Sequence, residues 1–284
     1  MQILEHGQAH TQTLLFFPCT AEPVWAFMQT IARLSQTWYV FQVVFDGHQP
    51  EDPGDFVSVE QTVDEVTGHL KKCGITRLDA AYGCSLGGAC LTRFLALGEI
   101  PVRCAIIDGG ITPYQFCYPL RKLVLARDIL SFKIAANSRK VLERAFPPER
   151  FTLPGQDPVK EYDAIEAYLK TYSDRTIRNV FRSGNNYDLP RSPAANGTNI
   201  AYWYGEDEKK DRKNNIRFIC RYFPQIQLRT FPNMAHAELV ILHPEEFCRY
   251  ADAFLTEQTD TASVRNRASS GTDKTNGERG KQAL

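Results

Sequence analysis

Short apolar runs alternate with stretches of helical period through the first 110 residues, and this alternation most narrows the folds open to the chain. The runs are rich in β-branched and aromatic residues, which favour strands. We expect strands at residues 13–17, 38–45, 78–82 and 103–107. Because strands separated by helices pair in parallel, the pattern predicts an α/β fold with a parallel sheet covered by helices on both faces.

The segments between the first three runs carry helix signals. Pro23 suits a first helical turn, and apolar residues recur at helical spacing up to Leu34. In the next segment Ser58 and Gln61 form a capping box, and Gly74 ends the apolar period. The order of elements is therefore strand, helix, strand, helix, strand.

The strand pattern stops near residue 111 and returns near residue 198. The intervening residues, 111–197, are amphipathic and predict a helical insertion. The alternation then resumes, with strands expected at 199–204 and 225–231 and helices at 214–222 and 244–255. We expect one core made of residues 1–110 and 198–256. Residues 257–284 contain no aromatic side chain and no period, and they predict a disordered tail.

Composition excludes several partners. The chain has 33 basic and 33 acidic residues, so it has no net charge with which to hold nucleic acid or an anionic membrane. The N-terminus lacks the basic start and apolar run of a signal peptide, and no segment approaches a membrane span. Eight cysteines are scattered without a C-x-x-C pair, which is typical of buried thiols in a reducing compartment. We expect a soluble, cytoplasmic protein without a metal or disulfide.

A G-x-S-x-G motif follows the third expected strand. It runs from Gly83 to Gly87, with Ser85 at its centre. A serine on a sharp strand-to-helix turn has strained backbone angles, and glycine two positions to either side leaves room for strand and helix to meet. Gly88 lets the next helix, expected at residues 89–97, pack closely, and its N-terminus directs free N–H groups towards the serine. The motif predicts a nucleophilic serine.

In this setting the chain resembles the α/β-hydrolase fold superfamily and, more loosely, small bacterial serine hydrolases. The resemblance covers residues 13–110 and 198–255. It implies a triad in the order serine, acid, histidine, and a helical cap at residues 111–197, between the sixth and seventh strands. The segment FDGHQPED also resembles the family's aspartate-glycine-histidine turn, where Asp46 and His48 shape a loop rather than perform chemistry.

A serine hydroxyl needs a general base, and the base needs a carboxylate that fixes its tautomer. Of six histidines, the resemblance places the base at His236, just after the last strand, although Ala237 follows it where the family usually has glycine. His243, at a helix start, is the less favoured alternative. The others precede the motif or lie on an expected helix: His6, His10, His48 and His69.

The acid is expected after the strand at 199–204, where the sequence reads YGEDEKKD. The family's spacing from the glycine selects Glu208, and Asp207 is an alternative. Asp108, at the end of the strand at 103–107, is a third option because some members of the fold carry their acid there. These alternatives stay open at the level of sequence.

The oxyanion hole requires two N–H groups directed at the developing negative charge. The resemblance assigns one to Leu86 and the other to Cys19 or Thr20, in the loop after the first strand. Family members commonly have His-Gly or two glycines in this loop, whereas this chain has Pro18 before Cys19. Proline has no N–H, so its neighbours must donate.

We therefore expect a serine hydrolase that cleaves an ester, thioester or amide of a small molecule through an acyl-enzyme on Ser85, without metal or organic cofactor. An aromatic set in the insertion would form much of an apolar pocket: Tyr114, Phe116, Tyr118, Phe132, Tyr172 and Phe181. The same triad also serves acyl transfer or carbon–carbon cleavage, and the altered oxyanion loop is compatible with a non-catalytic binder of a small molecule or protein. Substrate and oligomeric state do not follow from the sequence.

Overall fold

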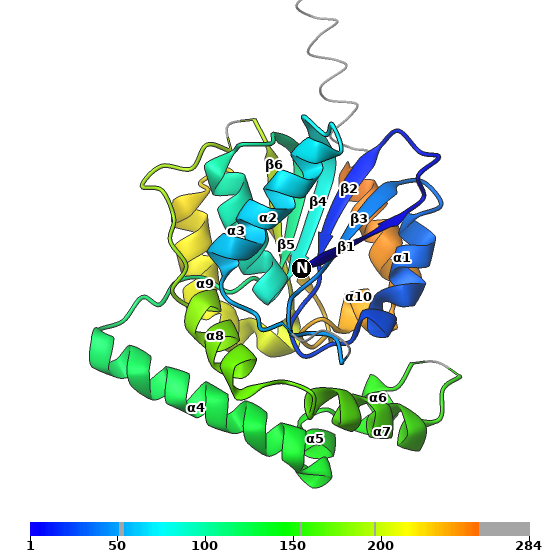
Figure 1. Cartoon of the computed structure of the whole chain (residues 1–284), viewed down its shortest axis with the longest axis vertical. Helices are drawn as coiled ribbons and strands as arrows, with labels where there is room; N and C mark the ends of the chain where they lie inside the picture. Colours follow the sequence, from blue (N-terminus) through cyan, green and yellow to red (C-terminus); the bar gives the residue numbers. More distant parts are fainter. Residues whose placement is uncertain (51–53, 154, 196, 256–284) are drawn as a thin grey trace, which may run out of the picture.

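The expected strands form one seven-stranded sheet in a computed structural model (Figure 1), which describes residues 1–50, 54–153, 155–195 and 197–255. The strands lie in the order β1-β3-β2-β4-β5-β6-β7, and all neighbours are parallel except β1 and β3. Their bounds are β1 Gln2–His6, β2 Thr13–Phe17, β3 Tyr39–Val44, β4 Leu78–Cys84, β5 Val102–Asp108, β6 Asn199–Gly205 and β7 Gln227–Phe231. The predicted α/β class is confirmed.

The edge strand β1 was not predicted from the sequence. Its residues lie half-buried or exposed because only one side of the strand is paired, to β3, in the register Gln2 with Val44. Such a strand lacks the continuous apolar run of the central strands. By contrast, all five residues of β2 are buried, which is why their run is so clear in the sequence.

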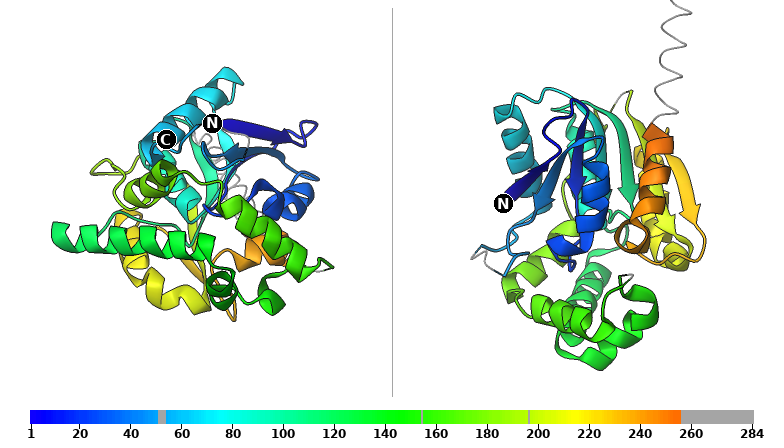
Figure 2. Two further views of the ribbon diagram at one scale, coloured as in Figure 1. Left: turned by 60° about the horizontal axis from the view of Figure 1, so that its bottom comes forward. Right: turned by 90° about the vertical axis from the view of Figure 1, so that its right-hand side faces the viewer.

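Helices cover both faces of the sheet, as predicted (Figure 2). One face packs against α2, α3 and α9, and its core includes Val63, Leu91 and Ile219. The other packs against α1 and the helix at 244–255, whose Phe247 and Ala251 join its core. The bounds of the labelled helices around the sheet are η1 Val24–Phe27, α1 Met28–Leu34, α2 Val59–Lys72, α3 Leu86–Leu97, η2 Glu206–Glu208, α9 Lys209–Tyr222 and α10 Glu238–Leu242.

Local signals set several of these helix boundaries. Ser58 Oγ accepts a hydrogen bond from the Gln61 N–H at 3.1 Å, as the predicted start of α2 requires.

Two helices begin earlier than expected. Helix α3 starts at Leu86, directly after Ser85, and α9 starts at Lys209 because the charged YGEDEKKD segment forms η2 and the first turn of α9 instead of an open loop.

Residues 111–184 form a helical layer beyond the carboxyl ends of the parallel strands (Figures 1 and 2), and the following residues return along α3, where the Ala194 N–H donates to the Ala96 carbonyl at 2.8 Å. The layer has its own small core, which includes Tyr162 and Leu169. It follows β5, the fifth strand, and precedes β6, so the expected position between the sixth and seventh strands is not confirmed for the sheet of the described residues. Its helices are α4 Tyr118–Asn137, α5 Arg139–Ala145, α6 Pro148–Phe151, α7 Pro158–Leu169 and α8 Asp174–Gly184.

Two of the segments discussed from the sequence lie wholly or partly outside the described residues. The expected disordered tail, residues 257–284, lies outside the described residues, as do Glu51 and Asp52 of the FDGHQPED segment. Within the described part of the chain, every helix is too short or too polar to cross a membrane.

The turn between β4 and α3 packs with almost no free space. A Cβ atom at Gly87 would lie 2.4 Å from the carbonyl oxygens of both Phe17 and Pro18, and one at Gly83 would lie 2.4 Å from the carbonyl oxygen of Gly87. Backbone atoms cannot yield as a flexible side chain can. The glycines of the motif therefore bring α3, β4 and the loop after β2 into direct contact.

We predict that Gly87→Ala lowers the free energy of unfolding by about 2 kcal/mol or more, because the methyl group overlaps two carbonyl oxygens. Chemical denaturation followed by circular dichroism measures the effect. Gly68→Ala is the matched control: it lies inside α2 with no atom within 4 Å of the added methyl. Since alanine favours helix, that variant is expected to gain about 0.5–1 kcal/mol. Equal stability of the two variants would refute the packing argument.

Candidate active site

Ser85 sits on the strained turn that the motif predicts. Its backbone has φ 55° and ψ −111°, a left-handed φ that residues other than glycine rarely adopt. Three backbone hydrogen bonds hold it: the Ser85 N–H donates to the Asp108 carbonyl at 2.9 Å, and the N–H groups of Ile111 and Ala89 each donate to the Ser85 carbonyl at 3.1 Å. The serine is 7% exposed. The turn after β5 thus fixes the conformation of the serine.

Of the three candidate acids, Glu208 is the one that contacts His236. Its Oε2 lies 2.7 Å from His236 Nδ1, and its Oε1 accepts the Gly205 N–H at 3.1 Å. Asp207 points elsewhere and pairs with Arg150 at 2.8 Å. Because Nδ1 donates to the carboxylate, the neutral imidazole carries its proton there, and Nε2 is left as the basic nitrogen.

Asp108 is buried and binds a different partner. Tyr82 donates its hydroxyl hydrogen to Asp108 Oδ2 at 2.7 Å. Burial raises the pKa of Asp108 to about 7, against the opposing effect of the tyrosine hydrogen bond. Asp108 therefore acts on the site through its backbone, which holds Ser85, while its side chain lies in the core beside Tyr82.

The loop after β7 presents His236. The ring lies against Gly109, where an added Cβ would be 2.7 Å from His236 Nδ1, so only glycine leaves room for it. Ala237 has φ 61°, the left-handed conformation that glycine favours, so the loop keeps this bend although alanine replaces the family's usual glycine. The side chain of His243 is more exposed, at 42% against 29% for His236, and lies 3.9 Å from Glu238.

Ser85 and His236 border the same turn, residues 108–111, from two sides. Ser85 is bonded to its backbone, and His236 packs on Gly109. Among the described residues no hydrogen bond joins Ser85 Oγ to the imidazole. Catalytic hydrogen bonds are often long or poorly aligned without substrate, so the missing bond does not by itself exclude proton transfer.

Sequence reasoning missed Arg212, which completes the buried group around His236. Its Nε lies 2.6 Å from Glu208 Oε2, and its Nη2 lies 3.3 Å and 3.5 Å from the two ring nitrogens of His236. The only signal was the spacing of four between Glu208 and Arg212 at a helix start, which is usually a surface ion pair. Here the side chain of Arg212 is just 17% exposed.

This arrangement sets the charges of the site. Burial opposes ionisation of Glu208, but the hydrogen bonds and charges of His236 and Arg212 outweigh it and lower its pKa to about 2. Burial and the Arg212 charge lower the pKa of His236, and Glu208 only partly opposes them. At neutral pH the group therefore holds an ionised Glu208 and a neutral imidazole, the form that accepts a proton.

The candidate oxyanion loop after β2 is braced by residues outside it. Thr20 donates its hydroxyl hydrogen to His48 Nε2 at 2.9 Å, because His48 Nδ1 donates to the Asp46 carbonyl. The Ala21 N–H is taken by the Tyr172 hydroxyl at 3.2 Å. Hence His48, expected only to shape its own loop, also supports the loop after β2. Ala21 does not offer a free donor, whereas no hydrogen bond is described for the N–H of Thr20.

A cavity of about 460 Å³ opens beside His236, between the helical layer and the loops of the sheet. Of the six aromatic residues expected to line a pocket, Phe132 and Phe181 do so, whereas Tyr118 is 67% exposed and Tyr172 braces Ala21. Four other aromatic residues that the sequence did not single out also line it: Trp25, Phe146, Phe151 and Tyr162. The cavity is mainly apolar.

The charged residues that line this cavity are all acidic: Glu22, Asp128, Glu161 and Glu238. Arg150 pairs with Glu238 at 2.7 Å, and Arg127 pairs with Asp128. Burial, together with the nearby Glu161, raises the pKa of Glu22 to about 8. The cavity wall, as far as the described residues define it, contains no lysine or arginine.

Comparisons with known proteins agree with this architecture. A family model described as the alpha/beta hydrolase family matches residues 4–250. No curated protein matches the sequence significantly. The chain is also similar to solved structures whose sequence identity is so low that they support the shared fold alone.

Three of these structures illustrate the match. A protein described under the alpha/beta hydrolase family from Desulfitobacterium hafniense has 16% identity and a TM-score of 0.67, covering 89% of this chain and 100% of its own. A carboxylesterase of Nitrososphaera gargenis has 16% identity and a TM-score of 0.68, covering 92% and 95%. MenH from S. aureus has 17% identity and a TM-score of 0.67, covering 91% and 98%.

We predict opposite shifts in the pKa of His236 when its two charged neighbours are removed. Arg212→Gln raises this pKa because a nearby positive charge is lost, and Glu208→Gln lowers it because a negative charge is lost. NMR titration of the histidine Cε1–H signals, assigned with His236→Gln, measures both. Arg212→Lys keeps the charge and is expected to stay closer to the wild type. Shifts of the same sign in both glutamine variants would contradict this electrostatic account.

Proposed function

Because the chain belongs to the alpha/beta hydrolase family, we propose that it is a serine hydrolase in which Ser85 is the nucleophile, His236 the general base and Glu208 the acid that orients it. The carboxylate–imidazole contact of 2.7 Å carries the proposal, since it fixes the tautomer a base needs, next to the turn that holds Ser85. In this proposal Asp207 and Asp108 have no catalytic role: Asp207 forms an ion pair with Arg150, and the side chain of Asp108 is buried beside Tyr82.

The reaction proceeds in two acyl transfers. Ser85 Oγ attacks the substrate carbonyl carbon while its proton passes to His236 Nε2, and the carbonyl oxygen becomes an oxyanion. When the intermediate collapses, the bond to the leaving group breaks and His236 returns the proton to that group. Water, deprotonated by the same nitrogen, then attacks the acyl-enzyme; the bond to Ser85 Oγ breaks, His236 returns the proton to that oxygen, and the acid leaves.

In this proposal, backbone N–H groups stabilise the oxyanion by donating hydrogen bonds to it. Leu86 begins α3 directly after Ser85, and the contact of Gly87 with Phe17 and Pro18 brings the loop after β2 against this turn. We assign the second donor to Thr20 or Cys19. Bracing of Thr20 by His48 and of Ala21 by Tyr172 supports a preorganised loop without the family's usual glycines.

The helical insertion, residues 111–197, acts in this proposal as a cap that provides the substrate pocket. The cavity beside His236 is lined by aromatic and aliphatic side chains, which suits an apolar acyl or alcohol group. A substrate carboxylate would lose its hydration water on entering this cavity, and no lysine or arginine lines the described cavity wall to form an ion pair with it. The proposed substrates are therefore apolar or cationic esters, thioesters or amides of small molecules.

One alternative keeps the fold and discards catalysis. The chain would then bind a small molecule or protein without reacting with it, and the missing hydrogen bond between Ser85 Oγ and His236 among the described residues is the observation behind this alternative. Acyl transfer and carbon–carbon cleavage remain alternatives within the same triad, because they differ only in what enters the cavity.

We predict that a fluorophosphonate probe labels Ser85 covalently. Ser85→Ala abolishes labelling, and His236→Ala and Glu208→Gln slow it by about 100-fold or more, since an unactivated serine reacts poorly. Gel fluorescence and intact mass measure the extent and rate. Asp207→Asn is the matched control, one residue away and in a surface ion pair, with an expected change of less than about threefold. An unlabelled wild type would favour the binder.

We predict a charge preference among substrates. Para-nitrophenyl butyrate is expected to be hydrolysed with a kcat/KM at least about tenfold above that of the para-nitrophenyl monoester of succinic acid, because the latter carries a carboxylate into an acidic, apolar cavity. Initial rates from nitrophenolate absorbance provide the values. At a pH above 8, where Glu22 is ionised, Glu22→Gln should narrow the difference. Preference for the succinate ester would show that the acyl group does not occupy this cavity.

A further inference from the structure

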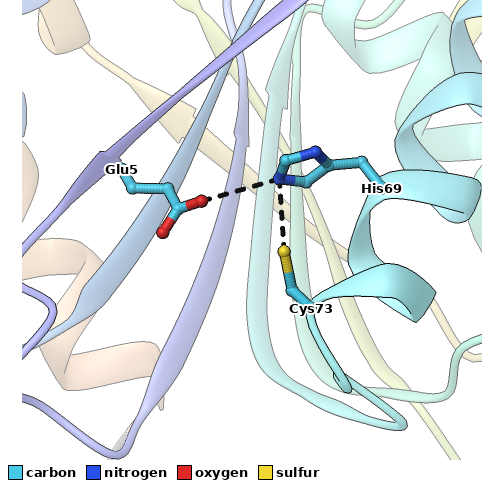
Figure 3. Close-up of side chains that lie close together, drawn as sticks. All are labelled: Glu5, His69 and Cys73. Carbon is cyan, nitrogen blue, oxygen red and sulfur yellow. Dashed lines mark hydrogen bonds and ion pairs between the residues drawn. The ribbon is translucent and has the colours of Figure 1, made fainter.

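A carboxylate, an imidazole and a thiol meet at the opposite end of the sheet from Ser85. Glu5 comes from the edge strand β1, and His69 and Cys73 lie at the carboxyl end of α2, four residues apart. At that spacing two side chains of a helix share one face. Figure 3 shows all three side chains directed at a common point, with both Glu5 and Cys73 facing the same ring nitrogen.

The distances between the donor atoms fit a tetrahedral ion. His69 Nε2 lies 3.6 Å from Glu5 Oε1 and 3.5 Å from Cys73 Sγ, and all three donor atoms lie within 4.8 Å of one another. Typical zinc–ligand bond lengths require donor separations of roughly 3.3 to 3.7 Å at a tetrahedral angle. Two separations already match, and the third closes by rotation of exposed Cys73.

The surroundings favour a bound cation. Tyr39 donates its hydroxyl hydrogen to Glu5 Oε2, which leaves Oε1 facing His69 and supplies the outer hydrogen bond that metal-bound carboxylates usually have. The cluster also lies at the carboxyl end of α2, where the helix dipole is negative. Glu5 Oε1 and Cys73 Sγ both contact the same ring nitrogen of His69, which carries one lone pair or one hydrogen for the two of them.

From this geometry we propose that Glu5, His69 and Cys73 form a zinc site. Thiolate, imidazole and carboxylate together match the ligands of Zn²⁺, and water takes the fourth position. Cys73 Sγ bonds to the ion as the thiol releases its proton to solvent. The bound ion links β1, which has a strand partner on one side only, to α2, and so stabilises the edge of the sheet.

The test uses the full chain without a histidine tag, kept under reducing conditions. Titration with Zn²⁺ by calorimetry is expected to give one saturable site, and Co²⁺ in its place to give a sulfur-to-metal charge-transfer band. Cys73→Ser removes the band, and His69→Gln and Glu5→Gln weaken Zn²⁺ binding by about tenfold or more. In hydrogen exchange, Zn²⁺ is expected to slow the amides of β1 in the wild type and not in Cys73→Ser.

Cys117→Ser is the matched control, since Cys117 is also exposed but lies directly before α4. It is expected to keep both the band and the affinity. The proposal is overturned if the wild type shows no saturable binding, if the band survives in Cys73→Ser, or if it is lost in Cys117→Ser. Comparison of the zinc-free melting temperatures separates a folding defect from lost binding. Fluorophosphonate labelling reports on Ser85 independently of this site.

Discussion

The whole arrangement depends on the close approach of four backbone segments around Ser85. Added Cβ atoms at Gly83, Gly87, Gly88 or Gly110 would each lie within 2.6 Å of a neighbouring atom. Because that space is kept empty, β4, α3, the loop after β2 and the turn after β5 can touch. Their contact holds the serine at a φ of 55° and brings the candidate oxyanion donors alongside it. A strained residue persists only where its surroundings determine it so fully.

A second constraint is electrostatic, and it explains why Glu208, His236 and Arg212 must be understood together. A buried carboxylate is costly, and a buried guanidinium equally so, unless each meets hydrogen-bonding partners of opposite charge. Glu208 satisfies this through the Gly205 N–H, Arg212 and His236. Removing any one member leaves another charge or dipole without its partner. The group thereby fixes β6, η2, α9 and the loop after β7 relative to one another.

Sequence patterns predicted the central strands well because each is buried on both faces and reads as a continuous apolar run. The same reasoning could not find β1, whose single paired side leaves it half-exposed, or Arg212, whose sequence context looks like a solvated charge run. Glu208 could be ranked above Asp207 only by family spacing. What separates them is the direction of each side chain, and direction depends on tertiary packing. Cavity residues such as Trp25 and Phe146 come from segments far apart in the chain, so no local pattern groups them.

The helical layer leaves the sheet after β5 and returns at β6, and these two strands are direct neighbours, with Cys104 paired to Asn199. The entire excursion thus joins two neighbouring parallel strands, leaving at the carboxyl end of β5 and returning to the amino end of β6. Evolution can lengthen, shorten or exchange such a module without disturbing the strands that carry the serine and its partners. On the proposed function, changes of substrate range would be confined to residues 111–197, while Ser85, His236 and Glu208 keep their places. The same boundaries mark where a chimaera could graft a foreign module onto this framework.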